Sequence, residues 1–221
     1  MGRISDLLKH PADLRYAFGK GAAAALRGLV WQLLHLRRPR GLFLGAGVKF
    51  VSADNLRLGR DVSIGARSYI ETSAAEPVVF GTRVTLRENA WVQCRSGFNE
   101  RGAGLEIGDR TYIGPNAVIG VGGKIRIGSG CQIGAGLSLA AESHSFHDGG
   151  YTTGKVDRKG ITIGPDCWFG NNVTVLDGVD IGAGCVIGAN STVTRSVPAG
   201  AVAFGTPARV RRQSADGEAD V

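Results

Sequence analysis

The sequence is poor in aromatic residues and in helix-forming runs. Aromatics make up 7% of the 221 residues, and few helix-forming runs follow residue 36. The 35 glycines are more than twice the average share of about 7%. They follow no Gly-X-Y period, which excludes a collagen-like chain. Glycines without that period serve turns, so we expect many short strands joined by tight corners.

No apolar stretch is long enough to span a membrane. The run Leu29–Leu34 lies between Arg27 and His35, whereas a spanning helix needs about 20 apolar residues. The N-terminus also lacks the small-residue cleavage site of a signal peptide. We therefore expect a cytoplasmic protein.

Motifs for nucleic acid, structural zinc and disulfides are missing. The formal net charge of +7 suits nucleic acid, anionic membranes or phosphate-bearing small molecules. Because neither zinc-finger spacing nor an aromatic-basic pattern accompanies this charge, we expect no nucleic-acid partner. The four cysteines form no CxxC pair, which is typical of a reducing compartment.

Apolar residues, often followed by glycine, recur every six positions in sets of three. Every longer step falls after the third member of a set: 10 residues (70 to 80), 15 (92 to 107), 8 (119 to 127) and 24 (139 to 163). The sets are Leu58, Ile64, Ile70; Phe80, Leu86, Val92; Ile107, Ile113, Ile119; Ile127, Ile133, Leu139; Ile163, Phe169, Val175; and Ile181, Ile187, Val193.

Each six-residue unit predicts one short strand followed by one corner. A unit this small buries its apolar side chains only by stacking on copies of itself. Three units per set predict a three-sided coil whose inserted loops all leave from one edge. A partial turn at Leu44 and Phe50 keeps the same phase. A second small or apolar residue follows each anchor by four positions, for example Val62, Ser68, Val84, Ala90, Thr111, Ala117, Val173, Val179 and Ser191.

The 24-residue step interrupts the repeat. An extra turn there would have Ser145, Tyr151 and Asp157 as its apolar anchors, so we expect residues 140–162 to form one long loop. The segment AAESHSFHDG at its start holds two of the four histidines and two carboxylates: Glu142, His144, His147 and Asp148.

This pattern resembles the hexapeptide-repeat acyltransferases over residues 44–210. The resemblance implies an all-β core built as a left-handed parallel β-helix; the left hand comes from the family, since the spacing gives only three sides. We expect an N-terminal α-helical segment at 1–41, the β-helix domain at 42–210 and a disordered tail at 211–221.

The loop is similar to the NHSFD-like segment of the family's sugar and polysaccharide O-acetyltransferases. By that match His144 is the general base. A neutral imidazole suits the removal of a proton from an attacking hydroxyl. Many relatives carry their histidine two positions earlier, where this chain has Glu142. Two arrangements therefore remain open: His144 acts with Glu142 as its orienting partner, or His147 is the base.

The C-terminal coils carry a second resemblance. Residues 166–179, DCWFGNNVTVLDGV, are similar to the family's D-x-W-I-G-x-N-V-x-I-x-x-G-V run, with Phe169 in place of isoleucine. Residues 187–198 resemble its IGAGSVVTKDVP run, and residues 205–209 its G-[NT]-P-A-[KR] ending. In the family this region binds coenzyme A between neighbouring subunits. The residues so implied are Trp168, Gly170, Asn171, Ala189, Thr194, Arg195 and Arg209.

The resemblance implies an acyl-CoA-dependent O-acyltransferase that uses acetyl-CoA. We expect its acceptor to be a hydroxyl of a sugar or surface-polysaccharide precursor, its assembly to be a homotrimer, and no metal to be needed. The alternatives are a serine- or antibiotic-type acetyltransferase and a non-catalytic hexapeptide scaffold. A carbonic-anhydrase-like zinc site is disfavoured because only His144 and His147 lie close enough together.

Three cysteines share one position of the repeat. Cys131, Cys167 and Cys185 each follow the first anchor of a turn by four residues, so they should stack about 4.8 Å apart. We favour small apolar fillers over a thiol nucleophile or a metal ladder. Cys94 follows Val92 in an expected loop and is the candidate for an exposed thiol.

Residues 4–36 show helical spacing of apolar residues, which Pro11 and Gly28 should break into pieces. A helix with apolar and basic faces can lie on a membrane surface. We favour packing against the protein itself or a neighbouring subunit, and keep peripheral membrane contact as the alternative.

Overall fold

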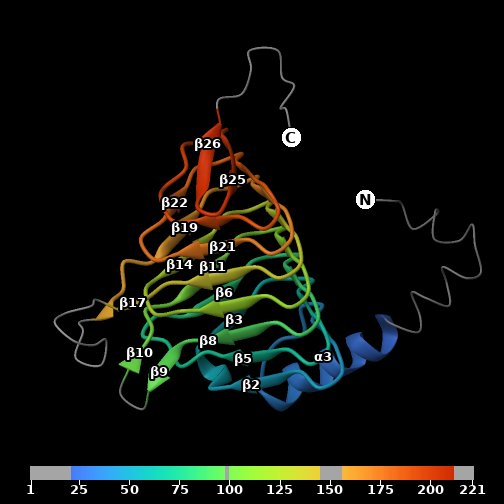
Figure 1. Cartoon of the computed structure of the whole chain (residues 1–221). Coiled ribbons are helices and arrows are strands. Elements are labelled where there is room, and N and C mark those ends of the chain that lie inside the picture. The colour runs from blue at the N-terminus through green and yellow to red at the C-terminus, as the bar shows by residue number, and fades with distance from the viewer. Residues whose placement is uncertain (1–20, 98–99, 145–155, 212–221) are drawn as a thin grey trace, which may run out of the picture.

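The computed structural model describes residues 21–97, 100–144 and 156–211. Short strands follow one another around a three-sided coil that rises from the N-terminal to the C-terminal end (Figure 1). Strands of successive turns pair in parallel, so that three sheets form the walls. The predicted left-handed parallel β-helix of hexapeptide repeats is confirmed.

The three walls contain nine, six and seven strands. We call them faces A, C and B, and the chain visits them in the order C, A, B. Face A contains β1 (Phe43–Leu44), β4 (Ser63–Ile64), β7 (Thr85–Leu86), β12 (Tyr112–Ile113), β15 (Gln132–Ile133), β20 (Trp168–Phe169), β23 (Val186–Ile187), β25 (Val202–Gly205) and the antiparallel β26 (Ala208–Arg211). Face C contains β3 (Leu56–Leu58), β6 (Val78–Phe80), β11 (Leu105–Ile107), β14 (Ile125–Ile127), β19 (Ile161–Ile163) and β22 (Asp180–Ile181). Face B contains β2 (Lys49–Val51), β5 (Tyr69–Glu71), β8 (Trp91–Gln93), β13 (Val118–Gly120), β16 (Ser138–Ala140), β21 (Thr174–Leu176) and β24 (Thr192–Val193).

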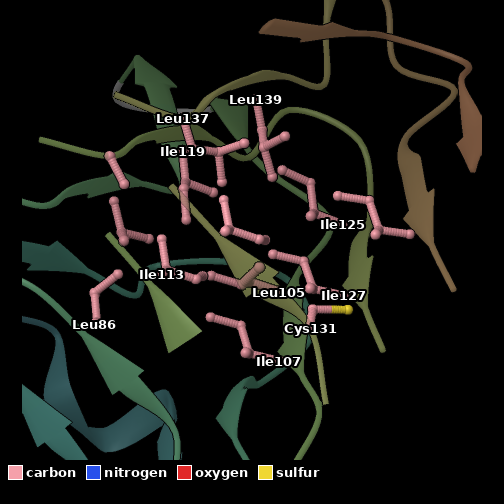
Figure 2. Packing of buried hydrophobic residues seen from close by; sticks show 14 of the residues in the cluster. Leu86, Leu105, Ile107, Ile113, Ile119, Ile125, Ile127, Cys131, Leu137 and Leu139 are labelled. Atoms are coloured by element: carbon pink, nitrogen blue, oxygen red, sulfur yellow. The ribbon is translucent and has the colours of Figure 1, made fainter. Parts of the chain in front are cut away.

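The repeat anchors stack inside the coil. On face C, Ile107 pairs in register with Phe80 on one side and with Ile127 on the other. All three side chains are buried, and Figure 2 shows this packing around Ile107, Ile113 and Ile119. Burial of a large aliphatic side chain stabilises the fold by about 1.5–3 kcal/mol, so the six-residue period supplies the core.

Each corner between faces A and B contains a residue with a left-handed backbone. Asn89, Asn116, Asn172 and Asn190 have φ between 57° and 62°, a conformation that asparagine tolerates well. Their side chains also link successive turns: Asn89 Nδ2 donates to Asn116 Oδ1 at 3.0 Å, and Asn172 Nδ2 donates to Asn190 Oδ1 at 3.2 Å. Asparagine therefore both permits the corner and connects it to its neighbour.

The insertions leave from the edge between faces B and C, as the spacing predicted (Figure 1). The 3₁₀ turn η2 (Ala53–Asn55) is at this edge in the first turn. Two insertions contain antiparallel pairs, β9 (Arg95–Gly97) with β10 (Glu100–Arg101), and β17 (Ser143–His144) with β18 (Val156–Asp157). The long insertion is therefore a hairpin stem rather than a plain loop in its described part.

The helix α3 (Ala23–Leu34) lies at the N-terminal end of the coil (Figure 1). Gly28 was expected to break it, but this residue lies within the helix and is buried. A Cβ at Gly28 would come 1.7 Å from the carbonyl oxygen of Leu42. Glycine is thus present because the helix approaches the chain closely there. Residues 1–20, including Pro11, lie outside the described residues, as does the tail after 211.

The apolar stripe of α3 does not pack on its own coil. The contact side contains Gly28 and Gln32, which are buried, and Trp31, which stacks 4.6 Å from Phe50 between ring centroids. Within the described residues, no helix is both long and apolar enough to cross a membrane. The exposed large apolar side chains of α3 and of the two residues after it are between 40% and 96% accessible; they are Leu26, Leu29, Val30, Leu33, Leu34 and Leu36.

The cysteines are all buried. Cys131, Cys167 and Cys185 lie inside the coil as fillers, and each Sγ contacts a backbone carbonyl oxygen of the next turn at 3.0–3.2 Å. Figure 2 shows Cys131 among the buried aliphatic side chains. Cys94 was expected to be an exposed thiol, which is wrong. Its side chain is fully buried, and its N–H donates to Glu71 Oε2 at 2.7 Å.

Candidate functional site

The long insertion is held firmly at both ends. Where it leaves the coil, Gly123 N donates to Ala141 O at 2.5 Å. Where it returns, the Asp177 carboxylate accepts hydrogen bonds from the backbone N–H groups of Lys159 and Gly160, at 3.1 and 2.8 Å. The stem is therefore fixed both where it leaves the turn of β16 and where it enters the turn of β21.

Glu142 and His144 lie at the start of this stem. Glu142 is partly buried, and Arg158 Nε donates to its Oε2 at 3.3 Å. Gly122 has no side chain because a Cβ there would lie 2.6 Å from the Glu142 Cβ. His144 is exposed in β17, in register with Val156 of β18. His147, the other candidate base, lies outside the described residues.

Arg158 links this stem to the insertion that contains β9 and β10. Its Nη2 donates to Glu100 Oε2 of β10 at 3.0 Å while its Nε contacts Glu142. The Arg158 side chain is 28% exposed. One guanidinium thus joins the two hairpins, since its planar fork can serve two carboxylates at once.

A shallow groove lies on face B at the foot of the stem. Its volume is about 230 Å³. Trp91 and Val118, on its wall, are 39% and 42% exposed. Glu142 forms part of the lining, so the groove and the histidine strand share one segment of chain.

The residues implied as coenzyme-binding lie on face A and at its corner with face B. Trp168 is 51% exposed on β20. Gly170 and Ala189 are adjacent between turns, since a Cβ on Gly170 would lie 2.6 Å from Ala189 N. The Gly170 N–H already donates to Ile187 O at 2.8 Å, so its amide hydrogen serves the coil. Asn171 is exposed, and its Oδ1 accepts from Ala135 N at 2.8 Å.

Three further implied residues are exposed near the C-terminal end of the coil. Thr194 and Arg195 follow β24, and Arg209 lies in β26, paired with Phe204 of β25. Arg209 contacts only the neighbouring carbonyl of Ala208 among the hydrogen bonds described for it. The guanidinium groups of Arg195 and Arg209 are thus exposed to solvent in the region that is expected to bind coenzyme A.

Sequence reasoning missed two residues of this region. Arg158 lies within the repeat interruption at residues 140–162, and no motif distinguishes it from other solvated arginines. Trp91 occupies the outward position before the anchor Val92, as Trp168 does before Phe169; that shared position was the available signal. No group of three His, Cys, Asp or Glu side chains suited to a metal occurs among the described residues.

Comparison with protein families finds the same repeat in two stretches of the chain. Residues 160–195 match the bacterial transferase hexapeptide, a model of six repeats. Residues 104–141 match the hexapeptide repeat of succinyl-transferase. No curated protein matches the chain.

Several solved structures are similar. A hexapeptide-repeat acetyltransferase from Vibrio cholerae O1 biovar eltor, solved with acetyl coenzyme A, is 24% identical over 95% of this chain and 87% of that chain, with a TM-score of 0.51. Another structure of a Vibrio cholerae hexapeptide-repeat acetyltransferase is 39% identical over 49% of this chain, with a TM-score of 0.47; the match spans 61% of that chain. An N-acyltransferase from Bacillus cereus, solved with dTDP and 3-hydroxybutyryl-CoA, is 13% identical over 78% of this chain and 79% of that chain, with a TM-score of 0.51.

The two similar structures with TM-scores of 0.51 support the same overall fold. The predicted resemblance is confirmed by the two repeat models and by the architecture together. The chain is thus a β-helix in which residues 104–141 and 160–195 match hexapeptide repeats of transferases.

Proposed function

We propose that the protein transfers an acetyl group from acetyl-CoA to a hydroxyl of a sugar or surface-polysaccharide precursor. The observation that carries this proposal is the long insertion, anchored at both ends, which contributes Glu142 to the lining of the groove on face B and carries His144 two residues later. The names of the similar Vibrio and Bacillus structures, an acetyltransferase and an N-acyltransferase bound to acyl-CoA, support the same chemistry.

In the proposed reaction the acceptor oxygen bonds to the acetyl carbonyl carbon, and the carbon–sulfur bond then breaks. The hydroxyl proton passes to the imidazole of His144 and from there to the leaving thiolate of coenzyme A. No enzyme nucleophile is needed because acceptor attacks donor directly. Glu142, fixed by Arg158, orients the strand that holds the base.

The donor is proposed to lie along face A. Trp168 would pack on the pantetheine arm, with Gly170, Asn171 and Ala189 at the corner beside it. Thr194, Arg195 and Arg209 would face the nucleotide, since guanidinium groups pair well with phosphate. The exposure of Trp168, Ala189, Arg195 and Arg209 is consistent with these roles.

We also propose a homotrimer, because the three walls differ in charge. Face C presents the ion pairs of Lys124 and Arg126 with Glu106, at 2.6 and 3.8 Å. The residue before each repeat anchor is uncharged in the parallel strands β1 to β23 of face A, and on face B only Lys49 in the first turn is charged; these residues are Phe43, Ser63, Thr85, Tyr112, Gln132, Trp168 and Val186 on A, and Lys49, Tyr69, Trp91, Val118, Ser138, Thr174 and Thr192 on B. Outside the groove around Trp91, these sparsely charged walls suit contact between copies. Light scattering after size exclusion tests the mass.

The exposed leucines of α3 are a candidate for peripheral membrane contact. Leu29 and Leu33 are 40% and 55% exposed, and the basic residues Arg38 and Arg40 that follow the helix are exposed too. An apolar face beside basic residues favours an anionic lipid surface, which agrees with a cytoplasmic, membrane-associated protein. Co-sedimentation with anionic vesicles, with Leu29→Glu and Leu33→Glu as variants, tests this contact against packing on a neighbouring subunit.

The decisive experiment measures thiol release from acetyl-CoA against a panel of sugars and nucleotide sugars. His144→Ala should lower kcat by about 10²–10⁴-fold and leave coenzyme binding in place. His35→Ala, at the residue after α3 and away from the insertion, is the matched control. If His144→Ala keeps full activity while His147→Ala loses it, then His147 is the base.

Two alternatives remain with clear tests. A serine- or antibiotic-type acetyltransferase would release thiol with amino acid or aminoglycoside acceptors and not with sugars. A non-catalytic hexapeptide scaffold would show no rise in melting temperature with coenzyme A, whereas a binding protein gains stability with ligand concentration.

A further inference from the structure

The groove on face B has an aromatic wall and a floor with hardly any side chains. In register across three turns, the first outward row is Trp91, Val118 and Ser138, and the second is Gln93, Gly120 and Ala140. The same second position holds Val51 and Leu176 in other turns. The depression exists because the chain places Gly120 and Ala140 where those turns carry large side chains.

We propose that this groove is the acceptor subsite, in which the Trp91 indole stacks on a single sugar ring of the acceptor. The proposal rests on the acetyl-transfer function proposed above and adds the place where the acceptor binds. Trp91 offers a broad apolar face, whereas Gln93, Ser138 and Glu142 supply polar atoms around it. A few polar groups around an apolar surface are typical of small-molecule sites.

Size and position favour a sugar ring over other occupants. The groove volume of about 230 Å³ lies below the roughly 300–1,000 Å³ of sites for drug-sized ligands, so one ring fits better than a larger body. A neighbouring copy would gain little from a floor of Gly120 and Ala140 surrounded by polar atoms. Glu142 lines the groove two residues before His144, which brings a ring on Trp91 close to the strand of the proposed base.

The first experiment observes Trp91 directly. The chain has three tryptophans, so the double variant Trp31→Phe and Trp168→Phe leaves Trp91 as the single indole. Titration with the sugar panel, without acetyl-CoA, should change its emission in a saturable way. An emission that responds to no sugar overturns the proposal.

The second experiment separates acceptor from donor. Trp91→Ala should raise the acceptor KM about tenfold or more and leave the acetyl-CoA KM within about twofold, whereas Trp91→Tyr should restore much of the loss. Gly120→Val should also raise the acceptor KM, because it fills the floor of the groove. Val51→Ser is the matched control, since it removes an exposed apolar side chain of face B that lies outside the groove lining and keeps the indole.

The outcomes separate the two proposals. If the wild-type protein acetylates sugars and Trp91→Ala behaves like wild type, the subsite is wrong and the activity stands. If Trp91→Ala changes the mass of the assembly and both KM values together, Trp91 belongs to an interface between copies, and the subsite is again wrong. If the wild-type protein binds acetyl-CoA and acetylates no sugar, the proposed function fails and the subsite falls with it.

Discussion

Arg158 donates a 3.0 Å hydrogen bond to Glu100, 58 residues away along the chain. Arg158 follows β18 in the long insertion, and Glu100 belongs to β10 in the insertion between β8 and β11. The same guanidinium also donates to Glu142. Both insertions leave the coil at one edge, so this contact sets their relative position beside the groove.

Replacing Arg158 should reduce activity more than stability. Arg158→Gln removes both ion pairs, and partly exposed pairs of this kind contribute about 0–1 kcal/mol, so the melting temperature should fall by no more than about 4 °C. We expect kcat to fall about tenfold, because Glu142 and the strand of His144 lose their support. Arg126→Gln, which loses the 3.8 Å pair with Glu106 on face C, should leave kcat unchanged. Equal effects of the two variants would contradict this role of Arg158.

Gly28 should tolerate no side chain. In Gly28→Ala the new Cβ would collide with Leu42 O at 1.7 Å, so α3 must shift away from the coil. We expect a loss of about 1–3 kcal/mol, as for other overpacked contacts, measured by chemical denaturation. Gly21→Ala is the matched control, since nothing lies within 4 Å of its Cβ position. A Gly28→Ala protein as stable as the control would show that α3 is not held by this contact.

Cys94 should make the protein less stable in alkali. Burial, and to a lesser extent the Glu71 charge, raise the pKa of the Cys94 thiol from 9.0 to about 12. The unfolded chain therefore loses this proton at lower pH than the folded chain does. The stability contribution is complete below pH 9 and is lost as pH rises toward 12, by at most about 1.4 kcal/mol per pH unit.

Cys94→Ala should remove that part of the alkaline slope. The free energy of unfolding is measured for wild type and variant at pH 8, 9 and 10. Other groups titrate equally in both proteins, so the difference between the two curves reports Cys94. The native thiol should also resist alkylation at pH 8, since its buried form stays protonated. Parallel stability curves for the two proteins would refute the assignment.

Trp168 should affect the KM for the donor acetyl-CoA, whereas Trp91 should affect the KM for the acceptor. Trp168→Ala should raise the acetyl-CoA KM by about tenfold and change stability little, because the indole is already 51% exposed. Arg195→Gln and Arg209→Gln should each weaken acetyl-CoA binding, with a smaller loss at high ionic strength where charge pairing is screened. A Trp168→Ala protein with an unchanged acetyl-CoA KM would remove the pantetheine role.

Much of the fold could be predicted because the geometry of a hexapeptide repeat follows directly from the spacing of its apolar residues along the sequence. Anchors six residues apart, such as Ile107, Ile113 and Ile119, must all point inward, so three of them per turn define a three-sided coil. The steps longer than six located every insertion on one edge. Cys131, Cys167 and Cys185 could be assigned to the interior on the same basis, since they occupy one position of the repeat.

Predictions from the sequence were wrong where contacts do not follow the six-residue period. Gly28 was interpreted as a helix breaker, because composition does not reveal that a neighbouring carbonyl replaces its side chain. Cys94 was assigned to an exposed loop, although the chain after Val92 stays against the coil before β9 begins. Neither error affects the repeat, since Gly28 lies in α3 and Cys94 at the start of an insertion.

What the sequence by itself determined is the coil, the edge that carries the insertions, and the presence of Glu142 and His144 in the longest of them. Only the tertiary structure decided that Arg158 joins Glu142 to Glu100 and that Trp91 lines one groove with Gly120 and Ala140. Periodic burial is a local property that each turn repeats. Contacts between insertions depend on the direction in which two hairpins leave the coil, and that direction is set by packing between turns rather than by any residue within them.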